Sequence, residues 1–110
     1  MQIEKLISKL ISYKTISENE NISLLNFISE YLNKYNVSSK IINKTDNRAN
    51  LYARLGPDVS GGIMFSGHTD VVPVEGQEWD SNPFVLKKRG EKLYGRGTAD
   101  MKSFIAVTLS

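Results

Sequence analysis

One histidine and two aspartates have the types and spacing that chemistry at a metal ion requires. His68 and Asp70 are two residues apart, so on an extended segment their side chains leave on the same side. Asp70 can then accept the second imidazole N–H, which fixes the tautomer and makes the other ring nitrogen more basic toward a metal. Asp100 follows a glycine-containing turn, and its two oxygens can bridge two divalent cations about 3.5–4 Å apart. The pattern favours a metal site at which His68 and Asp100 converge.

Each of these residues also has an alternative interpretation. A lone histidine is more often structural than functional, Asp70 fits a turn cap, and Asp100 fits the N-cap of a helix. Gly95–Gly97 resembles the opening of a dinucleotide fingerprint, but Asp100 replaces the third glycine and its charge repels a phosphate. Ser66 lies near the histidine, yet the absence of a Gly-x-Ser-x-Gly elbow disfavours a serine hydrolase.

Composition excludes several other classes of site. The chain has 110 residues and no cysteine, which excludes disulfides, thiol nucleophiles and thiolate-bound metals. Its net charge is +2, and its basic residues are scattered apart from one cluster that fits a solvated hairpin tip better than a nucleic-acid-binding stripe. No segment has the length of a membrane span or the apolar core of a signal peptide. We expect a cytoplasmic protein with no nucleic acid and no membrane as partner. The clustered basic residues are Lys87, Lys88, Arg89 and Lys92.

Two helices are predicted at the start of the chain. Apolar residues recur at three- and four-residue spacing over residues 3–11 and again over residues 24–32, which indicates amphipathic helices. Ser17 and Glu20 fit a capping box at the start of the second helix, which is expected to end near Tyr35–Asn36.

Strands are predicted from residue 39 onward. Residues 39–42 are rich in β-branched side chains, and residues 51–55 alternate apolar and polar side chains as a half-buried strand does. A glycine-rich hairpin connection leads to Ile63–Phe65, an apolar triplet typical of a strand covered on both faces in a parallel sheet. Because open α/β sheets bind ligands at the carboxyl ends of their strands, we expect Ser66–Asp70 to lie at a ligand site.

A loop, a hairpin and a helix are predicted after that site. Residues 75–83 read as a loop, with Trp79 and Phe84 folded back over the interior, followed by a hairpin over residues 85–94. Residues 102–110 are apolar on nearly every side and indicate the start of a buried helix. So short a helix is marginal by itself, and the parallel strand lacks a partner, so we expect a truncated chain.

Two ordered blocks of sequence resemble the dizinc metallopeptidase and deacylase family. This family includes acetylornithine deacetylase, succinyl-diaminopimelate desuccinylase, aminoacylase and glutamate-releasing carboxypeptidases. Within it, the wording of the chain is most similar to that of the acetylornithine deacetylases. The segments that carry the resemblance are Ser66–Pro73, Trp79, Asn82–Phe84 and Leu93–Lys102, with Ser12–Ser17 and Val74–Gln77 supporting the more specific likeness.

The resemblance implies a role for each candidate residue. His68 is similar to the histidine that ligates one zinc, Asp70 to the aspartate that orients it, and Asp100 to the carboxylate that bridges both metals. The Asp100–Met101 peptide bond is similar to one that is cis in the family. Ser103 departs from the family pattern, which commonly has glycine there, and this difference is expected to affect helix packing without touching a ligand. The implied cofactor is Zn²⁺, two ions per complete site, with Co²⁺ as an alternative.

The resemblance also implies a fold and a reaction. Residues 1–110 would form part of an α/β, zinc-exopeptidase-like catalytic domain, with two N-terminal helices, a mixed sheet and no lid domain. The implied reaction is hydrolysis of an N-acyl amino acid, foremost N-acetylornithine to ornithine and acetate in arginine biosynthesis. Desuccinylase, aminoacylase or carboxypeptidase activity is the alternative within the family. The complete enzyme would be a homodimer.

The number of available ligands limits what the chain is expected to do alone. A catalytic zinc takes three protein ligands and a water, so a bridged two-metal centre needs about five ligating side chains. His68 and Asp100 supply two, and the resemblance places the general-base glutamate and the other ligands beyond Ser110. We therefore expect the chain to be inactive alone. A non-catalytic remnant or binding module is the alternative of another class.

Overall fold

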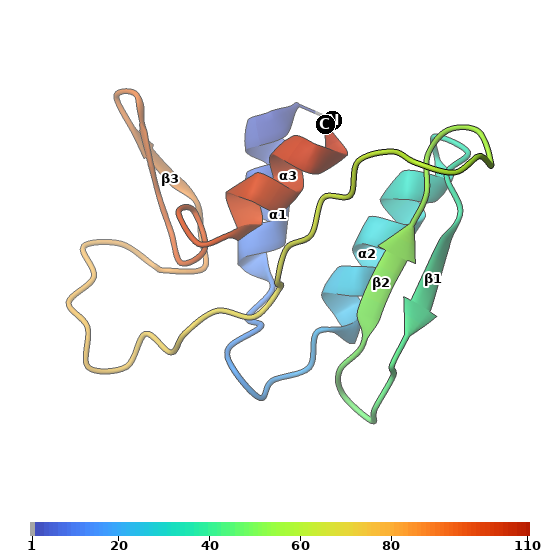
Figure 1. Ribbon diagram of the computed structural model, residues 1–110. Coiled ribbons are helices and arrows are strands. Elements are labelled where there is room, and N and C mark those ends of the chain that lie inside the picture. The colour runs from blue at the N-terminus through green and yellow to red at the C-terminus, as the bar shows by residue number, and fades with distance from the viewer. Residues whose placement is uncertain (1) are drawn as a thin grey trace. The chain divides into compact units, whose positions relative to one another are not determined.

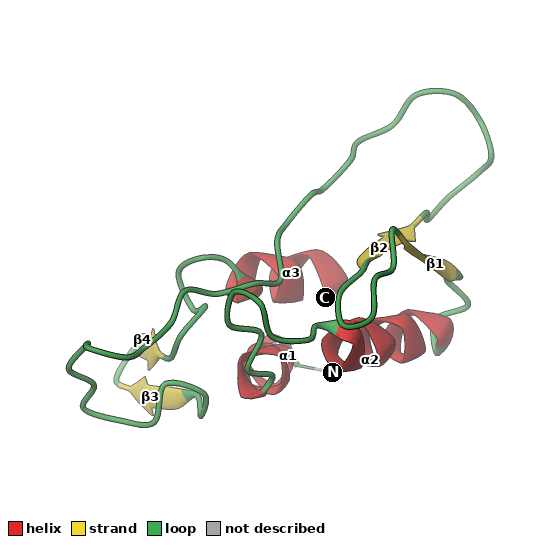
Figure 2. Ribbon diagram, turned by 90° about the horizontal axis from the view of Figure 1, so that it is seen from below, coloured by secondary structure: helices red, strands yellow, loops and turns green. Residues whose placement is uncertain are grey.

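A computed structural model describes residues 2–110, which form three helices and two antiparallel strand pairs (Figures 1 and 2). In chain order the elements are α1 (Ile3–Ser12), α2 (Ile22–Asn33), β1 (Ser39–Ile42), β2 (Asn50–Ala53), β3 (Lys87–Arg89), β4 (Lys92–Tyr94) and α3 (Lys102–Leu109). The described residues up to Asn19 form one compact unit with Gly67–Ser110, and Glu20–Ser66 form a second. The chain is therefore a small mixed α/β structure. Across residues 2–110 no helix has the length and apolar character that crossing a bilayer requires.

The first helix forms because its apolar side chains line one face. Leu6, Ile7, Leu10 and Ile11 are all buried, at the spacing that the sequence predicts for an amphipathic helix. α1 packs against α3, which lies beside it in Figure 1. The predicted first helix is confirmed.

The last helix is covered on one face only, so the expectation of a buried helix is wrong in part. Lys102 and Ala106 are buried, whereas Phe104 and Val107 are 40% and 56% exposed. α1 covers one side of α3, and within residues 2–110 the opposite side is left to solvent. A helix that is apolar all round needs neighbours on every side to be buried, and one packed helix supplies only one.

The second unit is one helix on one strand pair. The apolar residues Leu24, Leu25 and Ile28 of α2 are buried, and α2 contacts both β1 and β2. The two strands run antiparallel, with Ser39 opposite Ala53 and Ile42 opposite Asn50. Inner and outer positions alternate along β2 as predicted for residues 51–53. The predicted strand continued to residue 55, but β2 ends at Ala53 and Leu55 is 84% exposed, so that part of the prediction is wrong.

The predicted capping box at the start of α2 is wrong. The N-cap is Asn21, and Ser17 lies four residues before it with a positive φ of 36°. Glu20 instead accepts a hydrogen bond from the backbone N–H of Ser23 at 2.9 Å, and this bond lowers the pKa of the Glu20 carboxyl. The Asn21 side chain is used elsewhere, since its amide donates to the carbonyl of Ala49 and accepts from the N–H of the same residue, both at 3.0 Å.

The predicted covered strand at Ile63–Phe65 is also wrong, and so is the hairpin connection leading to it. These three residues form no strand in the structure, and they expose 85%, 77% and 65% of their surface. A covered strand requires paired strands beside it and layers above and below it. The only parallel pairing among residues 2–110 is an isolated bridge between Ile16 and Val71.

The later hairpin is confirmed, although it is shorter than predicted. β3 and β4 pair from Lys87 opposite Tyr94 to Arg89 opposite Lys92, and Gly90 takes a positive φ of 59° in the turn. The basic residues of β3 are exposed, as expected of a hairpin tip. In the loop before it, Phe84 is buried.

Candidate metal centre

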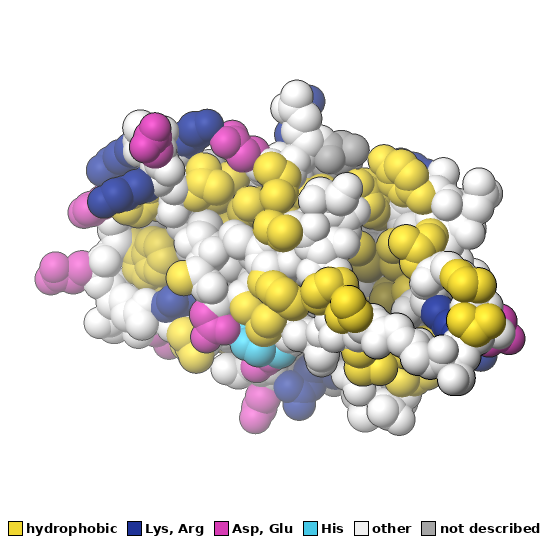
Figure 3. All heavy atoms as spheres, turned by 45° about the horizontal axis from the view of Figure 1, so that its top comes forward, with side chains coloured by type: hydrophobic (Ala, Val, Ile, Leu, Met, Phe, Trp, Pro, Cys, Tyr) yellow, Lys and Arg dark blue, Asp and Glu magenta, His cyan; other side chains and the backbone are white. Residues whose placement is uncertain are grey.

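The structure brings the three predicted site residues together. His68 Nε2 lies 2.9 Å from Asp100 Oδ1, although the two residues are 32 positions apart in the chain. On the other side of the ring, His68 Nδ1 lies 2.9 Å from the backbone carbonyl of Asp70 and 3.3 Å from its carboxylate oxygen Oδ1. Figure 3 shows the chain's single histidine at the surface, with acidic side chains beside it. All three residues belong to the first unit.

The contact with Asp70 differs in one respect from the sequence prediction. The carboxylate of Asp70 was expected to hold the imidazole, but the closer acceptor is the backbone carbonyl of that residue. A carbonyl oxygen only accepts, so His68 Nδ1 carries a hydrogen atom and Nε2 is the nitrogen that faces Asp100. The tautomer is thereby fixed in the sense expected of a ligand that binds through Nε2.

His68 is also anchored through its own backbone. Its N–H donates to Met101 Sδ at 3.3 Å, so the residue after Asp100 contacts the histidine directly. The Asp100–Met101 peptide bond is cis, as the resemblance implied. A Cβ atom on Gly67 would lie 3.2 Å from both Met101 Cε and Ile105 Cγ1, which explains why the position before the histidine carries no side chain.

The turn before Asp100 depends on two glycines for different reasons. Gly97 has a φ of +99°, which disfavours any residue with a Cβ. Gly95 is buried, and a Cβ on it would come within 3.3 Å of the Ile11 side chain. The turn is closed by Thr98, whose hydroxyl donates to the carbonyl of Gly95 at 2.9 Å. The glycines predicted to bend the chain therefore bring this turn close to α1.

Two alternative interpretations of the site residues lose support. The N-cap of α3 is Met101, and it makes no side-chain capping bond, so Asp100 is not the cap of this helix. Both ring nitrogens of His68 face aspartate oxygens, so neither is directed to Ser66 as a general base would be.

The residues present fit part of a metal centre. His68 Nε2 and Asp100 Oδ1 lie 2.9 Å apart. If both bound one zinc ion at about 2.05 Å, the N–Zn–O angle would be about 90°, against about 109° in a tetrahedron. A modest widening would accommodate the ion. The side chains of His68 and Asp100 are 48% and 82% exposed, so further ligands and water have access to them. Residues 2–110 contain no group of three or more histidine, cysteine, aspartate or glutamate side chains placed to hold a metal.

The electrostatics of the pair favour a cation. The hydrogen bond from His68 to the Asp70 carbonyl raises the pKa of the imidazole above its ordinary value, and the hydrogen bond to Asp100 and the two nearby carboxylates act in the same direction. Burial opposes them by lowering the pKa. The net effect is an imidazole whose surroundings stabilise positive charge, whether that charge is a proton on the ring or a metal ion beside it.

Sequence reasoning missed two buried residues behind the site. Thr15 is 3% exposed and follows α1, and Lys102 is 1% exposed and begins α3. Burial lowers the pKa of the Lys102 ammonium to about 8. The sequence contained one indication of a special role for Lys102, namely that a lysine begins an otherwise apolar helix. Thr15 had no indication beyond its place in a segment that resembles the family.

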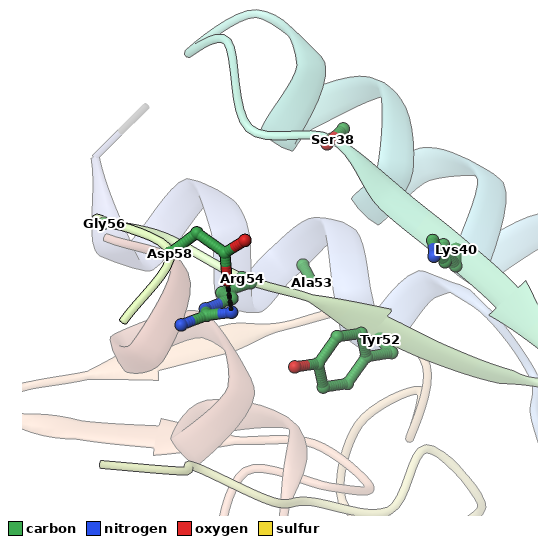
Figure 4. A pocket seen from close by; sticks show the side chains of 7 residues that line it. All are labelled: Ser38, Lys40, Tyr52, Ala53, Arg54, Gly56 and Asp58. Carbon is green, nitrogen blue, oxygen red and sulfur yellow. Dashed lines mark hydrogen bonds and ion pairs between the residues drawn. The ribbon is translucent and has the colours of Figure 1, made fainter. Parts of the chain in front are cut away.

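A separate hollow lies on the second unit and has no part in this site. It has a volume of about 350 Å³ and is seen from close by in Figure 4. Arg54, on its wall, is already bonded to Asp58 Oδ1 at 2.6 Å and to the carbonyls of Pro57 and Val59. The guanidinium is therefore committed to its own loop, and the hollow presents no chemistry comparable to that of the histidine pair. Its lining residues are Ser38, Lys40, Tyr52, Ala53, Arg54, Gly56 and Asp58.

Comparison with known proteins shows that the second part of the chain is similar to a family of peptidases. Residues 64–110 match Peptidase family M20/M25/M40, and this segment contains all three site residues. The resemblance to metallopeptidases and deacylases is thereby confirmed, as is the expected relationship to hydrolases.

Individual relatives extend the match over most of the chain. An acetylornithine deacetylase of Buchnera aphidicola subsp. Schizaphis graminum is 39% identical over 112 residues, covering 96% of this chain and 29% of the relative. A probable succinyl-diaminopimelate desuccinylase of Staphylococcus aureus is 37% identical over 99 residues, covering 89% and 24%. An acetylornithine deacetylase of Photorhabdus laumondii subsp. laumondii is 37% identical over 110 residues, covering 93% and 28%. The chain thus spans between 24% and 29% of the length of these relatives.

Proposed function

We propose that residues 1–110 are the N-terminal part of a zinc-exopeptidase-like catalytic domain, and that His68 and Asp100 are metal ligands in it. In the whole protein this domain would hydrolyse the amide bond of an N-acyl amino acid. The general-base glutamate and the remaining metal ligands would come from sequence equivalent to the rest of the relatives. The 110 residues alone would then be inactive, since two ligands do not complete a two-metal centre.

One observation supports this proposal above the others, namely the 2.9 Å approach of His68 Nε2 to a carboxylate oxygen of Asp100. The Asp70 carbonyl requires a hydrogen on Nδ1, so in the neutral ring Nε2 presents a lone pair to the carboxylate of Asp100 at 2.9 Å. Two lone pairs at that distance repel unless a cation lies between them. Below the imidazole pKa a proton supplies that cation, and in the working enzyme a divalent metal would.

When bound, the metals would lower the pKa of a shared water and polarise the amide carbonyl. The residues of this chain have the task of holding them. His68 supplies a neutral nitrogen, Asp100 supplies one or two carboxylate oxygens, and Asp70 keeps the ring in one tautomer and one orientation. None of the three is placed as the base that moves a proton to the leaving amine.

The names of the relatives support a substrate class for this proposal. Matches to acetylornithine deacetylases on one side and to succinyl-diaminopimelate desuccinylases on the other support an N-acyl amino acid. We propose N-acetylornithine as the first choice, which would place the enzyme in arginine biosynthesis in the cytoplasm as a homodimer. Succinyl-diaminopimelate is the second choice, followed by other acyl or peptidyl amino acids. Co²⁺ would substitute for Zn²⁺ in the same ligands.

The test has two arms. Calorimetric titration of the chain with Zn²⁺, and Co²⁺ absorption spectra, should show binding that His68→Ala or Asp100→Asn weakens more than about tenfold, the effect of losing even an outer-shell partner. Asp80→Asn removes an exposed carboxylate elsewhere and should leave binding unchanged. Tight, stoichiometric binding that survives His68→Ala would contradict the ligand assignment.

In the second arm the chain is joined to the remaining sequence of the Buchnera relative. The chimera should hydrolyse N-acetylornithine faster than N-succinyl-diaminopimelate. The reverse preference would move the substrate proposal to the desuccinylases. Metal binding without hydrolysis of any acyl amino acid would favour the other class, a binding module that keeps the motif without the reaction.

A further inference from the structure

A short connector, defined here as residues 13–17, is hydrogen-bonded both to the segment that carries His68 and Asp70 and to Lys102, which follows Asp100. It follows α1 and forms the isolated parallel bridge with Val71. Thr15 Oγ1 donates to the carbonyl of Thr69 at 2.5 Å, and the carbonyl of Thr15 accepts from the N–H of Val71 at 3.0 Å. The residues on both sides of Asp70 are therefore bonded to one buried threonine.

The same connector holds the turn that carries Asp100. Lys102 Nζ donates to the carbonyl of Tyr13 at 2.6 Å, and this carbonyl also accepts from the N–H of Thr15 at 2.9 Å. The Lys102 N–H donates to the carbonyl of Gly97 at 2.8 Å, and Lys102 Cδ and Cγ would lie 3.1 and 3.2 Å from a Cβ on that glycine. One side chain thus spans from the connector to the turn before Asp100.

The chemistry of Lys102 argues for more than space filling. The residue is 1% exposed, and placing an ammonium in the interior is unfavourable, whereas a leucine or methionine of similar volume would carry no such cost. What the lysine adds over such a residue is the directional bond to Tyr13, which fixes where α3 begins relative to the connector. The hydroxyl of Thr15 adds a directional bond in the same way, compared with valine.

We infer that Thr15 and Lys102 are positioning residues that hold the His68–Asp70 segment and the Asp100 turn at the separation a shared metal requires. The inference rests on the proposed function for its metal, but its geometric part concerns the metal-free chain. Neither residue touches the metal or the substrate. They act through the connector on the 2.9 Å approach of His68 Nε2 to Asp100 Oδ1.

The test measures the contact between His68 Nε2 and Asp100 by NMR. Because His68 is the only histidine, the resonances of its ring nitrogens are unambiguous. Long-range ¹H–¹⁵N spectra of the metal-free chain are recorded at one fixed pH for Thr15→Val and Lys102→Met. Both variants should shift the Nε2 resonance toward that of a free imidazole, and Thr15→Ser, which restores the hydroxyl, should return it. Thr108→Val and Lys87→Met make the same chemical changes at exposed positions and should leave it in place.

The second readout is the Zn²⁺ dissociation constant, which should rise about 10–100-fold in Thr15→Val and Lys102→Met. Unshifted His68 resonances in both variants would overturn the inference. Loss of the dispersed amide spectrum in both would also overturn it, because the two bonds would then support the whole unit rather than the site. If the unchanged chain and its chimera bind no Zn²⁺ while the resonances respond as expected, the proposed function fails and the positioning geometry stands.

Discussion

Replacing Gly97 by alanine is expected to destabilise the first unit by several times more than a matched change elsewhere. Gly97 has a φ of +99°, where a residue with a Cβ costs about 1–3 kcal/mol. Its new Cβ would also lie 3.1 Å from Lys102 Cδ, in a buried setting where overpacking typically costs about 1–3 kcal/mol. Alanine also restricts the unfolded chain more than glycine does, and this effect favours the folded state by about 0.4–1 kcal/mol. The expected net loss in unfolding free energy is about 3 kcal/mol, within a range of about 1–6 kcal/mol.

The matched control is Gly56→Ala. Gly56 has a similar φ of +106°, but nothing lies within 4 Å of its would-be Cβ. Its loop can relax, so we expect a loss of about 1 kcal/mol or less at that position. Urea unfolding followed by far-UV circular dichroism measures both values. Equal losses for the two variants would refute the reasoning, because the crowding of Lys102 and the tighter setting of the Gly97 turn should both add to the loss at Gly97.

Three further changes test the remaining contacts. In the metal-free chain, the surroundings of His68 raise the pKa of its imidazole. The stability that the protonated ring contributes is therefore complete below the unfolded pKa of about 6.5, and it is lost as the pH rises through the folded pKa. His68→Gln should remove this pH-dependent part from a curve of unfolding free energy against pH. Asn21→Ala removes both side-chain bonds that fix the start of α2 and should lower the unfolding free energy by about 1–3 kcal/mol, whereas exposed Asn26→Ala should change it by less than about 0.5 kcal/mol. Arg96→Ala removes the guanidinium that lies 5.2 Å from the ring centroid of Trp79, the only tryptophan, and should change its fluorescence emission; an unchanged spectrum would show that the contact is not formed in solution.

The spacing of apolar residues was sufficient to predict the elements that bury only one face. The spacing of Leu6, Ile7, Leu10 and Ile11 predicts α1, and the alternation along β2 predicts its inner and outer sides, because each pattern matches the period of its own backbone. The convergence of His68 with Asp100 was predicted from residue type, order and resemblance, and the structure brings the two side chains within hydrogen-bond distance.

Features set by tertiary contacts were not predictable. Ile63–Phe65 has the composition of a buried strand, but whether a strand is buried depends on neighbouring elements, which the three residues themselves do not specify. Ser17 and Glu20 have the spacing of a capping box, yet the backbone at Ser17 takes a positive φ and the helix begins later. The Thr15 hydroxyl bonds to the backbone carbonyl of Thr69, far along the chain, and a sequence does not indicate which backbone acceptor a side chain will meet.

The solvent-facing apolar triplet that precedes the metal centre has a consequence for handling the molecule. Ile63 and Met64 present 85% and 77% of their surface to water, in a segment that forms no strand of its own. Exposed apolar stretches that carry no charge favour association between copies. Aggregation of purified material should therefore begin at this stretch, a few residues upstream of His68, and it should worsen with protein concentration while the ligands themselves stay intact.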